Sequence, residues 1–249
     1  MPHTEVALVT GASRGLGLEV ARLLAQRGLR LILTARGARE LERAADELRP
    51  HTGVIALPGD IADRAHAERL VRAGAARFGS IDLLVNNAST LGPIPQPPLE
   101  SLRPDALDRI FRINVTAPLH LTQLVLSQMR ARGRGTIINI SSDAAVQAYA
   151  GWGGYSASKA ALEHLSRVLA AELAGSGGRV YVVDPGDMNT QMHRDADPGA
   201  DLSGLPGPEV AAGRLVELLA REEAPFGRFD LRSWSARDPR PEAQVAEVR

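Results

Sequence analysis

The stretch Thr10-Gly11-Ala12-Ser13-Arg14-Gly15-Leu16-Gly17 decides the fold of this chain. It follows an apolar run at residues 6–10 and leads into a helical pattern over residues 15–27. A glycine-rich turn between a strand and a helix lets the backbone approach a pyrophosphate, and the helix N-terminus presents free N–H groups to the phosphates. The sequence therefore predicts a dinucleotide site formed by Gly11, Ser13, Arg14, Gly15, Leu16 and Gly17.

Short apolar runs alternate with helical stretches along the rest of the chain. We expect strands at residues 6–10, 30–35, 54–58, 81–85, 136–141, 180–183 and 226–231. We expect helices at residues 15–27, 37–49, 63–78, 104–131, 154–174 and 208–222. Pro118 should either kink the helix at residues 104–131 or mark its first turns. Apolar strands without alternation, separated by helices, are typical of a parallel sheet. The predicted fold class is therefore α/β, a single doubly wound (Rossmann-like) parallel sheet with helices on both faces.

The chain shows no linker or repeat that would divide it. We therefore expect residues 1–232 to form one domain and residues 233–249 to form a polar C-terminal tail. Residues 185–208, rich in Gly, Pro and Asp, follow the sixth expected strand as a long loop. Long loops at the carboxyl ends of strands in such sheets lie where ligands bind, so we predict a substrate lid here.

The composition narrows the class of protein. The 249 residues include 29 basic and 29 acidic side chains, so the formal net charge is zero. This balance argues against nucleic acid or an anionic membrane as a partner, and no apolar run reaches the length that spans a bilayer. The absence of cysteine excludes a disulfide scaffold and a thiolate metal site. We expect a cytoplasmic protein with a small-molecule substrate and no metal.

The choice of dinucleotide depends on the residues beside the second expected strand. A carboxylate there would hydrogen-bond the adenosine ribose and repel a 2′-phosphate, but the sequence reads Leu33-Thr34-Ala35-Arg36. Arg36 and Arg14 can instead clamp a 2′-phosphate between two guanidinium groups. The sequence therefore favours NADP(H) over NAD(H).

Lys159 is the only lysine among the 29 basic residues, and Tyr155 precedes it by four positions. On a helix this spacing puts the phenol and the ammonium on one face. A nearby ammonium lowers the pKa of a phenol from about 10 toward working pH. Taken alone, Lys159 is equally well a surface residue left over in an arginine-rich composition.

Seven motifs in order resemble the short-chain dehydrogenase/reductase family over about residues 5–190. They are the glycine turn, Asp60-Ile61, Asn86-Asn87-Ala88-Ser89, Asn114, Ile140-Ser141-Ser142, Tyr155-Ser156-Ala157-Ser158-Lys159 and Pro185-Gly186. The resemblance implies a catalytic tetrad of Asn114, Ser142, Tyr155 and Lys159, and Ser142 is chosen over Ser141 for its separation from Tyr155. It also implies cofactor contacts from Asp60, Ile61, Asn87, Ala88, Tyr155, Lys159, Pro185, Gly186 and Thr190, and a homodimer or homotetramer.

The resemblance implies a carbonyl chemistry for these residues. Tyr155 would donate a proton to the substrate oxygen, with its pKa lowered by Lys159, and Ser142 would donate to the developing alkoxide. Asn114 would hold a water molecule that links Lys159 to solvent. The sequence departs from the family at Ser89, where glycine is usual, at Asp184, where many members carry asparagine, and over its C-terminal third.

The substrate is expected to contact apolar residues near Ser142, Tyr155 and the lid. These are Val146, Trp152, Met188 and Met192, with Tyr149 and His193 in the same stretches, although Trp152 and the methionines also suit ordinary packing. We predict an oxidoreductase that transfers hydride between NADP(H) and the carbonyl or secondary alcohol of a small hydrophobic substrate. The alternatives are a NAD-dependent alcohol dehydrogenase and a catalytically silent NADP(H)-sensing protein.

Overall fold

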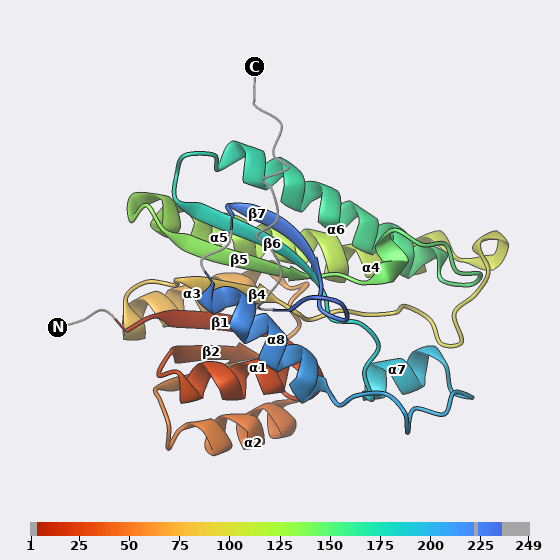
Figure 1. Ribbon diagram of the computed structural model, residues 1–249, viewed down its shortest axis with the longest axis horizontal. Helices are drawn as coiled ribbons and strands as arrows, with labels where there is room; N and C mark the ends of the chain where they lie inside the picture. Colours follow the sequence, from red (N-terminus) through yellow and green to blue (C-terminus); the bar gives the residue numbers. More distant parts are fainter. Residues whose placement is uncertain (1–3, 222–223, 236–249) are drawn as a thin grey trace.

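The computed structural model describes residues 4–221 and 224–235. Their strands form one parallel sheet in the order β3-β2-β1-β4-β5-β6-β7 (Figure 1). The strands are β1 (Val6–Thr10), β2 (Arg30–Thr34), β3 (Val54–Ala56), β4 (Leu83–Asn86), β5 (Gly135–Ile140), β6 (Gly178–Asp184) and β7 (Phe226–Asp230). The helices are α1 (Gly15–Gln26), α2 (Ala38–Leu48), α3 (Arg64–Phe78), α4 (Pro104–Phe111), α5 (Ala117–Ala131), α6 (Gly153–Glu172), α7 (Gln191–Ala196) and α8 (Pro208–Ala220). The strand order reverses between β1 and β4, so the predicted doubly wound fold class is confirmed.

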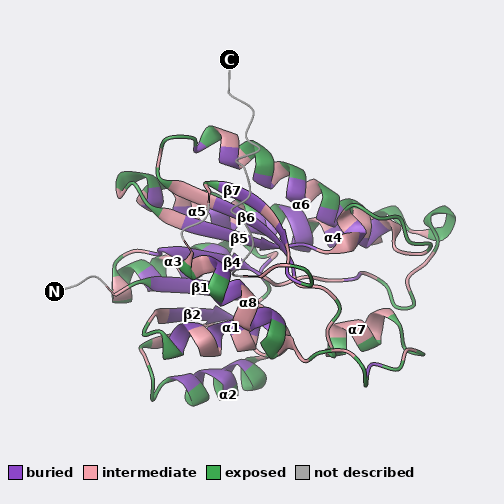
Figure 2. Ribbon diagram, in the orientation of Figure 1, coloured by how far each residue is buried: buried purple, intermediate pink, exposed green. Residues whose placement is uncertain are grey.

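Helices cover both faces of the sheet, whose strands are mostly buried (Figures 1 and 2). On one face α1, α2 and α8 pack against the strands through a cluster that includes Leu24, Leu41 and Leu215. On the other face α3 and α5 pack through a second cluster that includes Leu70 and Leu121. All five residues of β1 are buried, which explains why the strand sequences are apolar without alternation.

The helix expected at residues 104–131 is divided into three parts. Helix α4 ends at Phe111, a π-helical turn η2 spans Arg112–Thr116, and α5 begins at Ala117. Pro118 lies in the first turn of α5, where its missing N–H costs no hydrogen bond. The π-helical turn carries Asn114, and such turns are frequent at functional sites.

Several expected strand boundaries differ from the structure by a few residues. β4 begins at Leu83 rather than at residue 81, because the N–H of Ile81 donates to the side chain of Gln128 (3.1 Å) instead of to a neighbouring strand. β3 ends at Ala56, before Pro58, which has no N–H for pairing. Hydrogen bonds to side chains and the missing donor of a proline thus shorten two of the expected strands.

The segment 185–208 is not the structureless loop that the sequence predicts. Helix α7 forms within it, and the hydroxyl of Thr190 caps the helix by accepting a hydrogen bond from the N–H of His193 (3.3 Å). Leu202 is buried, so the later part of the segment is anchored to the molecule. A capping hydroxyl at the start of a short polar stretch stabilises a helical turn there.

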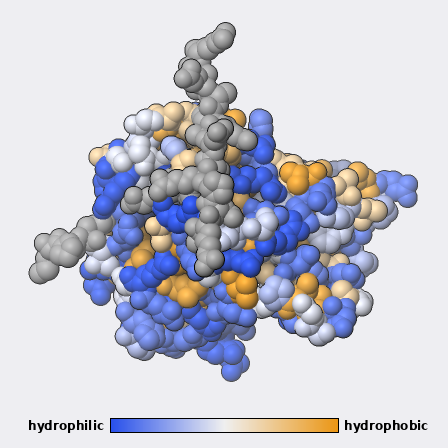
Figure 3. Space-filling model, in the orientation of Figure 1, coloured by the Kyte–Doolittle hydropathy of each residue, from blue (hydrophilic) through white to orange (hydrophobic). Residues whose placement is uncertain are grey.

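The expected polar tail at residues 233–249 falls largely outside the described residues, which end at residue 235. Within the described ranges, no helix combines the length and hydropathy of a membrane-spanning segment. On the face shown in Figure 3, hydrophobic residues form small separate areas between hydrophilic ones. The one-domain organisation of residues 1–232 stays a prediction.

Candidate active site

A cleft of about 1230 Å³ opens where the carboxyl ends of the strands meet. Its walls come from the glycine turn and the edge of β2 on one side, and from α6 and α7 on the other. The predicted cofactor and substrate residues that line it are Gly11, Ser13, Arg14, Gly15, Leu16, Arg36, Asp60, Ile61, Asn87, Ala88, Trp152, Pro185, Gly186, Met188, Thr190 and Met192. Ser142, Tyr155 and Lys159 also line it, whereas Gly17, Asn114 and Val146 do not.

The glycine turn brings backbone close to the cleft at the start of α1. Gly11 and Gly15 have positive φ angles of 66° and 57°, which residues with side chains rarely adopt. Gly17 lies behind the turn, where a Cβ would come within 2.4 Å of the carbonyl oxygen of Gly11. Asn87 braces the turn by donating its side-chain amide to the carbonyl oxygens of Thr10 (2.9 Å) and Gly11 (3.3 Å).

The start of α1 fits the phosphates of a dinucleotide. Its N-cap residue, Arg14, makes no side-chain hydrogen bond to the first turn, and that turn contains no acidic residue. The N–H groups and the positive end of the helix are therefore available to an anion. Because the same cleft continues to Tyr155, the residues present fit a nicotinamide dinucleotide with its phosphates at this turn.

Two exposed arginines, Arg14 from the glycine turn and Arg36 after β2, line the cleft together with one carboxylate from α2. Arg14 and Arg36 stand at the rim of the cleft. The side chain of neither forms a hydrogen bond or an ion pair with another residue of the described ranges. Glu40, which the sequence reasoning missed, also lines the cleft, and its Oε2 lies 2.5 Å from where a Cβ of Gly37 would stand. The sequence reasoning considered only residues at the end of the strand. Glu40 lies in the first turn of α2 and lines the same cleft as Arg36.

Tyr155 and Lys159 stand one turn apart near the start of α6, as their spacing predicts. The ammonium of Lys159 donates to the carbonyl oxygen of Ile140 at the end of β5 (2.7 Å) and lies 5.5 Å from the centre of the Tyr155 ring. Trp152 packs edge-on against the same ring, with 5.8 Å between the centroids. Lys159 is only 3% exposed, so the interpretation as a leftover surface lysine is wrong.

Burial dominates the acid–base properties of this pair. It raises the pKa of the Tyr155 phenol well above its ordinary value, although the nearby Ser142 hydroxyl acts in the opposite direction. It also lowers the pKa of Lys159 to about 8, against the attraction of Asp184 and Glu163. The sequence predicts that Lys159 lowers the pKa of the Tyr155 phenol, but the pKa is raised. Desolvation outweighs the charge of the ammonium, which is bound to a backbone carbonyl.

Asn114 lies behind the cleft wall, where its side chain is fully used by protein groups. Its Oδ1 accepts from the N–H of Thr90 (2.9 Å) and the hydroxyl of Ser89 (3.1 Å). Its Nδ2 donates to the carbonyl oxygen of Thr90 (2.9 Å) and to the hydroxyl of Ser158 (2.9 Å). Both donors and both lone pairs of the amide are thus engaged by protein groups, and a water molecule held by Asn114 stays a prediction. The side chain ties the loop after β4 to α6.

Ser142 follows β5 and lies at the N-terminus of the short 3₁₀-helical turn η3 (Asp143–Ala145). Its hydroxyl donates to the carboxylate of Asp143 (3.0 Å) and accepts from the N–H of Ala144 (3.2 Å). The sequence reasoning did not foresee Asp143 at this position in the site. A carboxylate beside Ser142 means that the hydroxyl has to rotate before it donates elsewhere.

The expected substrate residues are only partly brought together. Trp152, Met188 and Met192 line the cleft, and His193 joins them. Val146, the residue after η3, lies outside it with 63% of its surface exposed. Further lining residues come from the proline-rich loop after β4, whose place after a strand predicts ligand binding, and from α4, which the sequence reasoning missed. They are Leu91, Gly92, Pro93, Ile94, Ala106 and Arg109.

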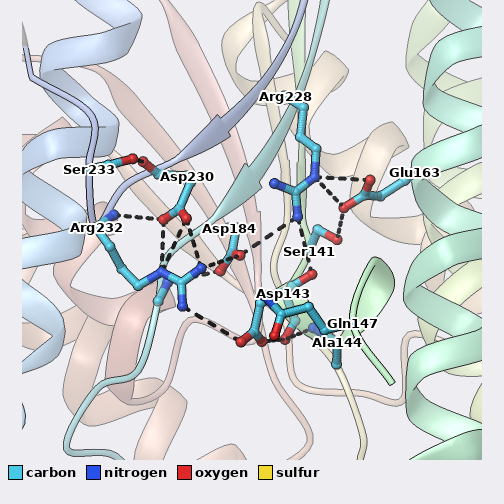
Figure 4. A network of polar contacts seen from close by, with 12 residues as sticks. Ser141, Asp143, Ala144, Gln147, Glu163, Asp184, Arg228, Asp230, Arg232 and Ser233 are labelled. Carbon is cyan, nitrogen blue, oxygen red and sulfur yellow. Dashed lines mark hydrogen bonds and ion pairs between the residues drawn. The ribbon is translucent and has the colours of Figure 1, made fainter. Parts of the chain in front are cut away.

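A network of charged side chains lies beside the chemistry end of the cleft (Figure 4). It joins Glu163 on α6 and Asp184 at the end of β6 to Arg228 and Arg232, which come from β7 and the turn after it. The sequence reasoning noted Asp184 as a departure but did not identify its partners, which lie more than forty residues away. Within the same ranges of residues, no group of three or more His, Asp or Glu side chains is placed to hold a metal ion.

Comparison with known proteins identifies the family. The chain matches the family model described as short chain dehydrogenase over residues 5–201. Dehydrogenase/reductase SDR family member 4 of Bos taurus is 34% identical over 239 residues, which cover 89% of this chain and 82% of that protein. Cis-4-hydroxycyclohexanecarboxylate dehydrogenase of Sinomonas cyclohexanicum is 34% identical over 223 residues, with 88% and 84% covered.

A solved structure agrees with this match. The metagenomic short-chain oxidoreductase in complex with NADP has a TM-score of 0.75 and 32% sequence identity to this chain, and the similarity covers 91% of this chain and 96% of that one. The family match spans the glycine turn, the Tyr155–Lys159 pair and the start of the segment after β6. This chain therefore belongs to the short-chain dehydrogenase/reductase family and is an oxidoreductase that acts on alcohol or carbonyl substrates with a nicotinamide cofactor.

Proposed function

We propose that this protein is an NADP(H)-dependent carbonyl reductase for small hydrophobic substrates. The observation that carries the proposal is the placement of Tyr155, Ser142 and Lys159 on the same cleft whose rim presents Arg14 and Arg36. The first three groups suit proton donation to a carbonyl oxygen, and the two arginines suit a 2′-phosphate. The same cleft therefore holds the groups proposed to select the cofactor and the groups proposed to transfer the proton.

The preference for NADP(H) is supported by charge at the edge of β2. Arg14 and Arg36 face the rim without a carboxylate partner among the described residues, so both guanidinium groups can bind a phosphate. The metagenomic short-chain oxidoreductase to which this chain is similar was solved in complex with NADP. The neutral Ala35 between Thr34 and Arg36 offers nothing that would repel a 2′-phosphate.

The proposed division of labour follows from the contacts of each residue. A bound reduced nicotinamide supplies the hydride. Tyr155 donates the proton of its hydroxyl to the substrate oxygen, and its raised pKa keeps that proton in place at neutral pH. Ser142 turns its hydroxyl from Asp143 toward the same oxygen. The ammonium of Lys159 stabilises the phenolate that Tyr155 becomes.

Asn114 supports this chemistry indirectly, through Ser158. Its amide holds the hydroxyl of Ser158, which in turn donates to the carbonyl oxygen of Tyr155 (2.7 Å). The π-helical turn that carries Asn114 is thereby connected to the first turn of α6. We propose that this contact fixes the position of Tyr155, because a shift of about 1 Å in a reacting group can cost about 100-fold in rate.

A hydrophobic substrate is supported by the walls opposite the glycine turn. Trp152, Met188, Met192, Leu91 and Ile94 line the cleft, and Trp152 and Met192 pack against the cluster that Leu91 forms with Tyr155. Methionine and aromatic side chains adapt to apolar groups of varied shape. The Sinomonas relative is named for an alicyclic hydroxy acid, which suggests ring ketones and their alcohols as the first compounds to test.

A NAD-dependent alcohol dehydrogenase is the second candidate, because Glu40 lines the cleft near Arg36. Its carboxylate is 4.0 Å from Arg43, and if it turned toward the ribose it would favour NAD(H). We place it second because two arginines face the same rim. The expected cytoplasmic location and homodimeric or homotetrameric state remain predictions.

The proposed function is tested by following cofactor absorbance with a panel of cyclic and aromatic ketones and aldehydes. Wild-type protein is compared with Tyr155→Phe, first with NADPH and then with NADH. We expect oxidation of NADPH with at least one hydrophobic carbonyl and little with NADH. Equal rates with both cofactors would support the second candidate, and turnover by Tyr155→Phe at the wild-type rate would contradict the assigned chemistry.

A further inference from the structure

Two arginines from the C-terminal strand reach the chemistry end of the cleft. The Nε of Arg228, on β7, donates to both carboxylate oxygens of Glu163 (3.0 and 3.1 Å). The same side chain lies 3.7 Å from Asp184 and donates to the carbonyl oxygen of Ser142 (3.4 Å). Arg228 therefore joins β7 to α6, to the end of β6 and to the backbone of Ser142 (Figure 4).

Arg232 forms the second half of this network, in the turn after β7. Its guanidinium pairs with Asp230 (2.7 Å) and lies 3.6 Å from both Asp143 and Asp184. Its side-chain stem crosses Gly186, where a Cβ would stand 2.3 Å from the Cγ of Arg232. Glycine at this position therefore permits the arginine to reach the carboxylates.

The network contains more negative than positive groups. Four carboxylates, those of Asp143, Glu163, Asp184 and Asp230, lie around three guanidinium groups, those of Arg228, Arg232 and Arg167, the last of which is 3.4 Å from Glu163. Glu163 and Asp184 are each 2% exposed, so water screens little of their charge. A buried excess of negative charge requires a further cation nearby.

Asp184 has one carboxylate oxygen, Oδ2, that lies 3.7 Å from Arg228 and 3.6 Å from Arg232. Its Oδ1 accepts from the N–H of Gly186 (3.0 Å), but its Oδ2 has no hydrogen-bond partner among the described residues. The ammonium of Lys159 is bound to Ile140, which pairs across the sheet with Val183, the residue before Asp184. The Lys159 ammonium is therefore held at the end of β5, beside the end of β6 where Asp184 stands, and both residues line the cleft.

We propose that Asp184 is a positioning residue whose buried carboxylate keeps Lys159 in its charged form and so supports proton donation by Tyr155. The proposal rests on the proposed function, because it assigns a role to a residue of the same site. Arg228 and Arg232 hold the carboxylate in place. Burial raises the pKa of Asp184, and the N–H of Gly186 and the charge of Arg232 oppose that increase. The strand β7 thereby contributes to the chemistry without touching the substrate.

The electrostatics agree in direction with this geometry. Burial lowers the pKa of Lys159 to about 8, and Asp184 is the main group that opposes the decrease, followed by Glu163. Burial raises the pKa of Tyr155, and Asp184 and Asp143 raise it further. Removing the charge of Asp184 should therefore lower both pKa values, and the pair should lose protons at a lower pH.

The groups that face this pair come from every element packed around it. They are Ser142 and Asp143 after β5, Asp184 and Asp187 at and after the end of β6, Glu163 and Arg167 on α6, and Arg228, Asp230 and Arg232 on β7 and its turn. Only Asp184 and Glu163 among them act on Lys159, and Glu163 is already bound by Arg228. The test therefore centres on Asp184.

The single lysine permits a direct test that needs no turnover. Protein labelled with ¹³Cε-lysine gives one side-chain signal, since Lys159 is the only lysine in the sequence. We expect the midpoint of its NMR titration to fall by about 1 pH unit in Asp184→Asn, the lower range of the effect of a close opposite charge. The asparagine keeps the carbonyl oxygen that accepts from Gly186, so a purely structural role would leave the titration unchanged.

Two further variants keep the test decisive. Asp187→Asn removes an exposed carboxylate three positions along the chain, and we expect the lysine signal to titrate as in wild type. Arg232→Gln removes a guanidinium from Asp184, and we expect the lysine midpoint to rise. This opposite shift in a more exposed residue remains measurable if Asp184→Asn does not fold.

The outcomes separate this inference from the proposed function. An unchanged lysine midpoint in both Asp184→Asn and Arg232→Gln would overturn the role of Asp184, even if the wild-type protein reduces carbonyls. A shifted midpoint in a protein that reduces no carbonyl would support the inference and count against the proposed function. Where carbonyl reduction is measurable, its decrease at alkaline pH should begin about 1 pH unit lower in Asp184→Asn.

Discussion

The two ends of the cleft are built in different ways. The end at α1 consists of backbone, with glycines at positions 11, 15 and 17 and a single brace from Asn87. The end at α6 consists of buried side chains, those of Lys159 and Tyr155, with carboxylates and arginines nearby from α6, from the ends of β5 and β6, and from β7 and its turn. The first end depends on shape and the second on charge, so they should respond to mutation in different ways.

This difference separates binding from chemistry. A glycine turn at a helix N-terminus holds phosphates whatever the reaction. A buried phenol and ammonium, by contrast, depend on their protonation states, which burial shifts by large amounts. We therefore expect changes at the glycine end to affect cofactor affinity and folding, and changes at the charged end to affect turnover.

The largest effect is expected for Lys159→Arg. The ammonium is buried and bound to Ile140, so a larger guanidinium should displace both this contact and the charge beside Tyr155. We expect turnover to fall at least about 100-fold with the fold intact. The double variant with Tyr155→Phe should be little worse than either single variant, because the two residues act as one unit.

The control for this exchange is Arg72→Lys, at an exposed position on α3. It should leave turnover unchanged. Near-normal turnover in Lys159→Arg, measured with any accepted carbonyl, would mean that the buried lysine serves packing alone and would favour the silent NADP(H)-sensing protein.

The next effect concerns the rim of the glycine end. Arg36→Ala should weaken NADPH binding about 10- to 100-fold, since a charge-assisted hydrogen bond contributes about 1.5–3 kcal/mol. NADH binding should change little, because it has no 2′-phosphate. Calorimetric titration with both cofactors measures this, with Arg39→Ala, an exposed arginine outside the cleft, as the control. Equal loss of both cofactors would remove the proposed phosphate clamp.

Gly17→Ala tests the tight packing of the glycine end. The added Cβ would lie 2.4 Å from the carbonyl oxygen of Gly11, so the turn must shift. We expect the free energy of unfolding to fall by about 1–3 kcal/mol. Gly213→Ala, on α8 with nothing within 4 Å of the added atom, should change it by no more than about 1 kcal/mol. Denaturant unfolding that shows equal stability for both variants would contradict this account of the turn.

The smallest effect concerns the segment 185–208, which contacts both ends. The Cγ2 of Thr190 lies 3.8 Å from where a Cβ of Gly15 would stand, and Met192 lines the cleft near Tyr155. If the segment is a lid, its amide hydrogen exchange should slow when cofactor and substrate are both present. Equal protection with and without the two ligands would show that it is a fixed wall.

The same contrast explains how much was predictable from the sequence. The glycine turn and the Tyr155–Lys159 pair depend on short spacings, so both the fold class and these positions follow from the sequence. Arg228 and Arg232 lie far from Glu163 and Asp184 in the chain, and only the pairing of β6 with β7 brings them together. The raised pKa of Tyr155 was not predictable either, because it depends on burial that no local pattern reveals.

Val146 and Asn114 illustrate the same limit at single positions. Val146 is exposed after η3, which its apolar character does not predict. The Asn114 amide bonds to Ser89, Thr90 and Ser158, which lie 24 to 44 residues away in the chain. Glu40 was missed because it lies in the first turn of α2 and not at the end of the strand, where an acid was expected. Helix α2 turns back toward that end and adds Glu40 to it.

The most direct test of the separation between binding and chemistry is Tyr155→Phe. The change removes one hydroxyl from a residue that is 8% exposed and leaves the ring against Trp152. NADPH affinity by calorimetry and carbonyl turnover are measured on the same preparation. The account predicts affinity within about twofold of wild type and turnover reduced at least about 100-fold. Affinity and turnover falling together, or turnover near the wild-type rate, would contradict it.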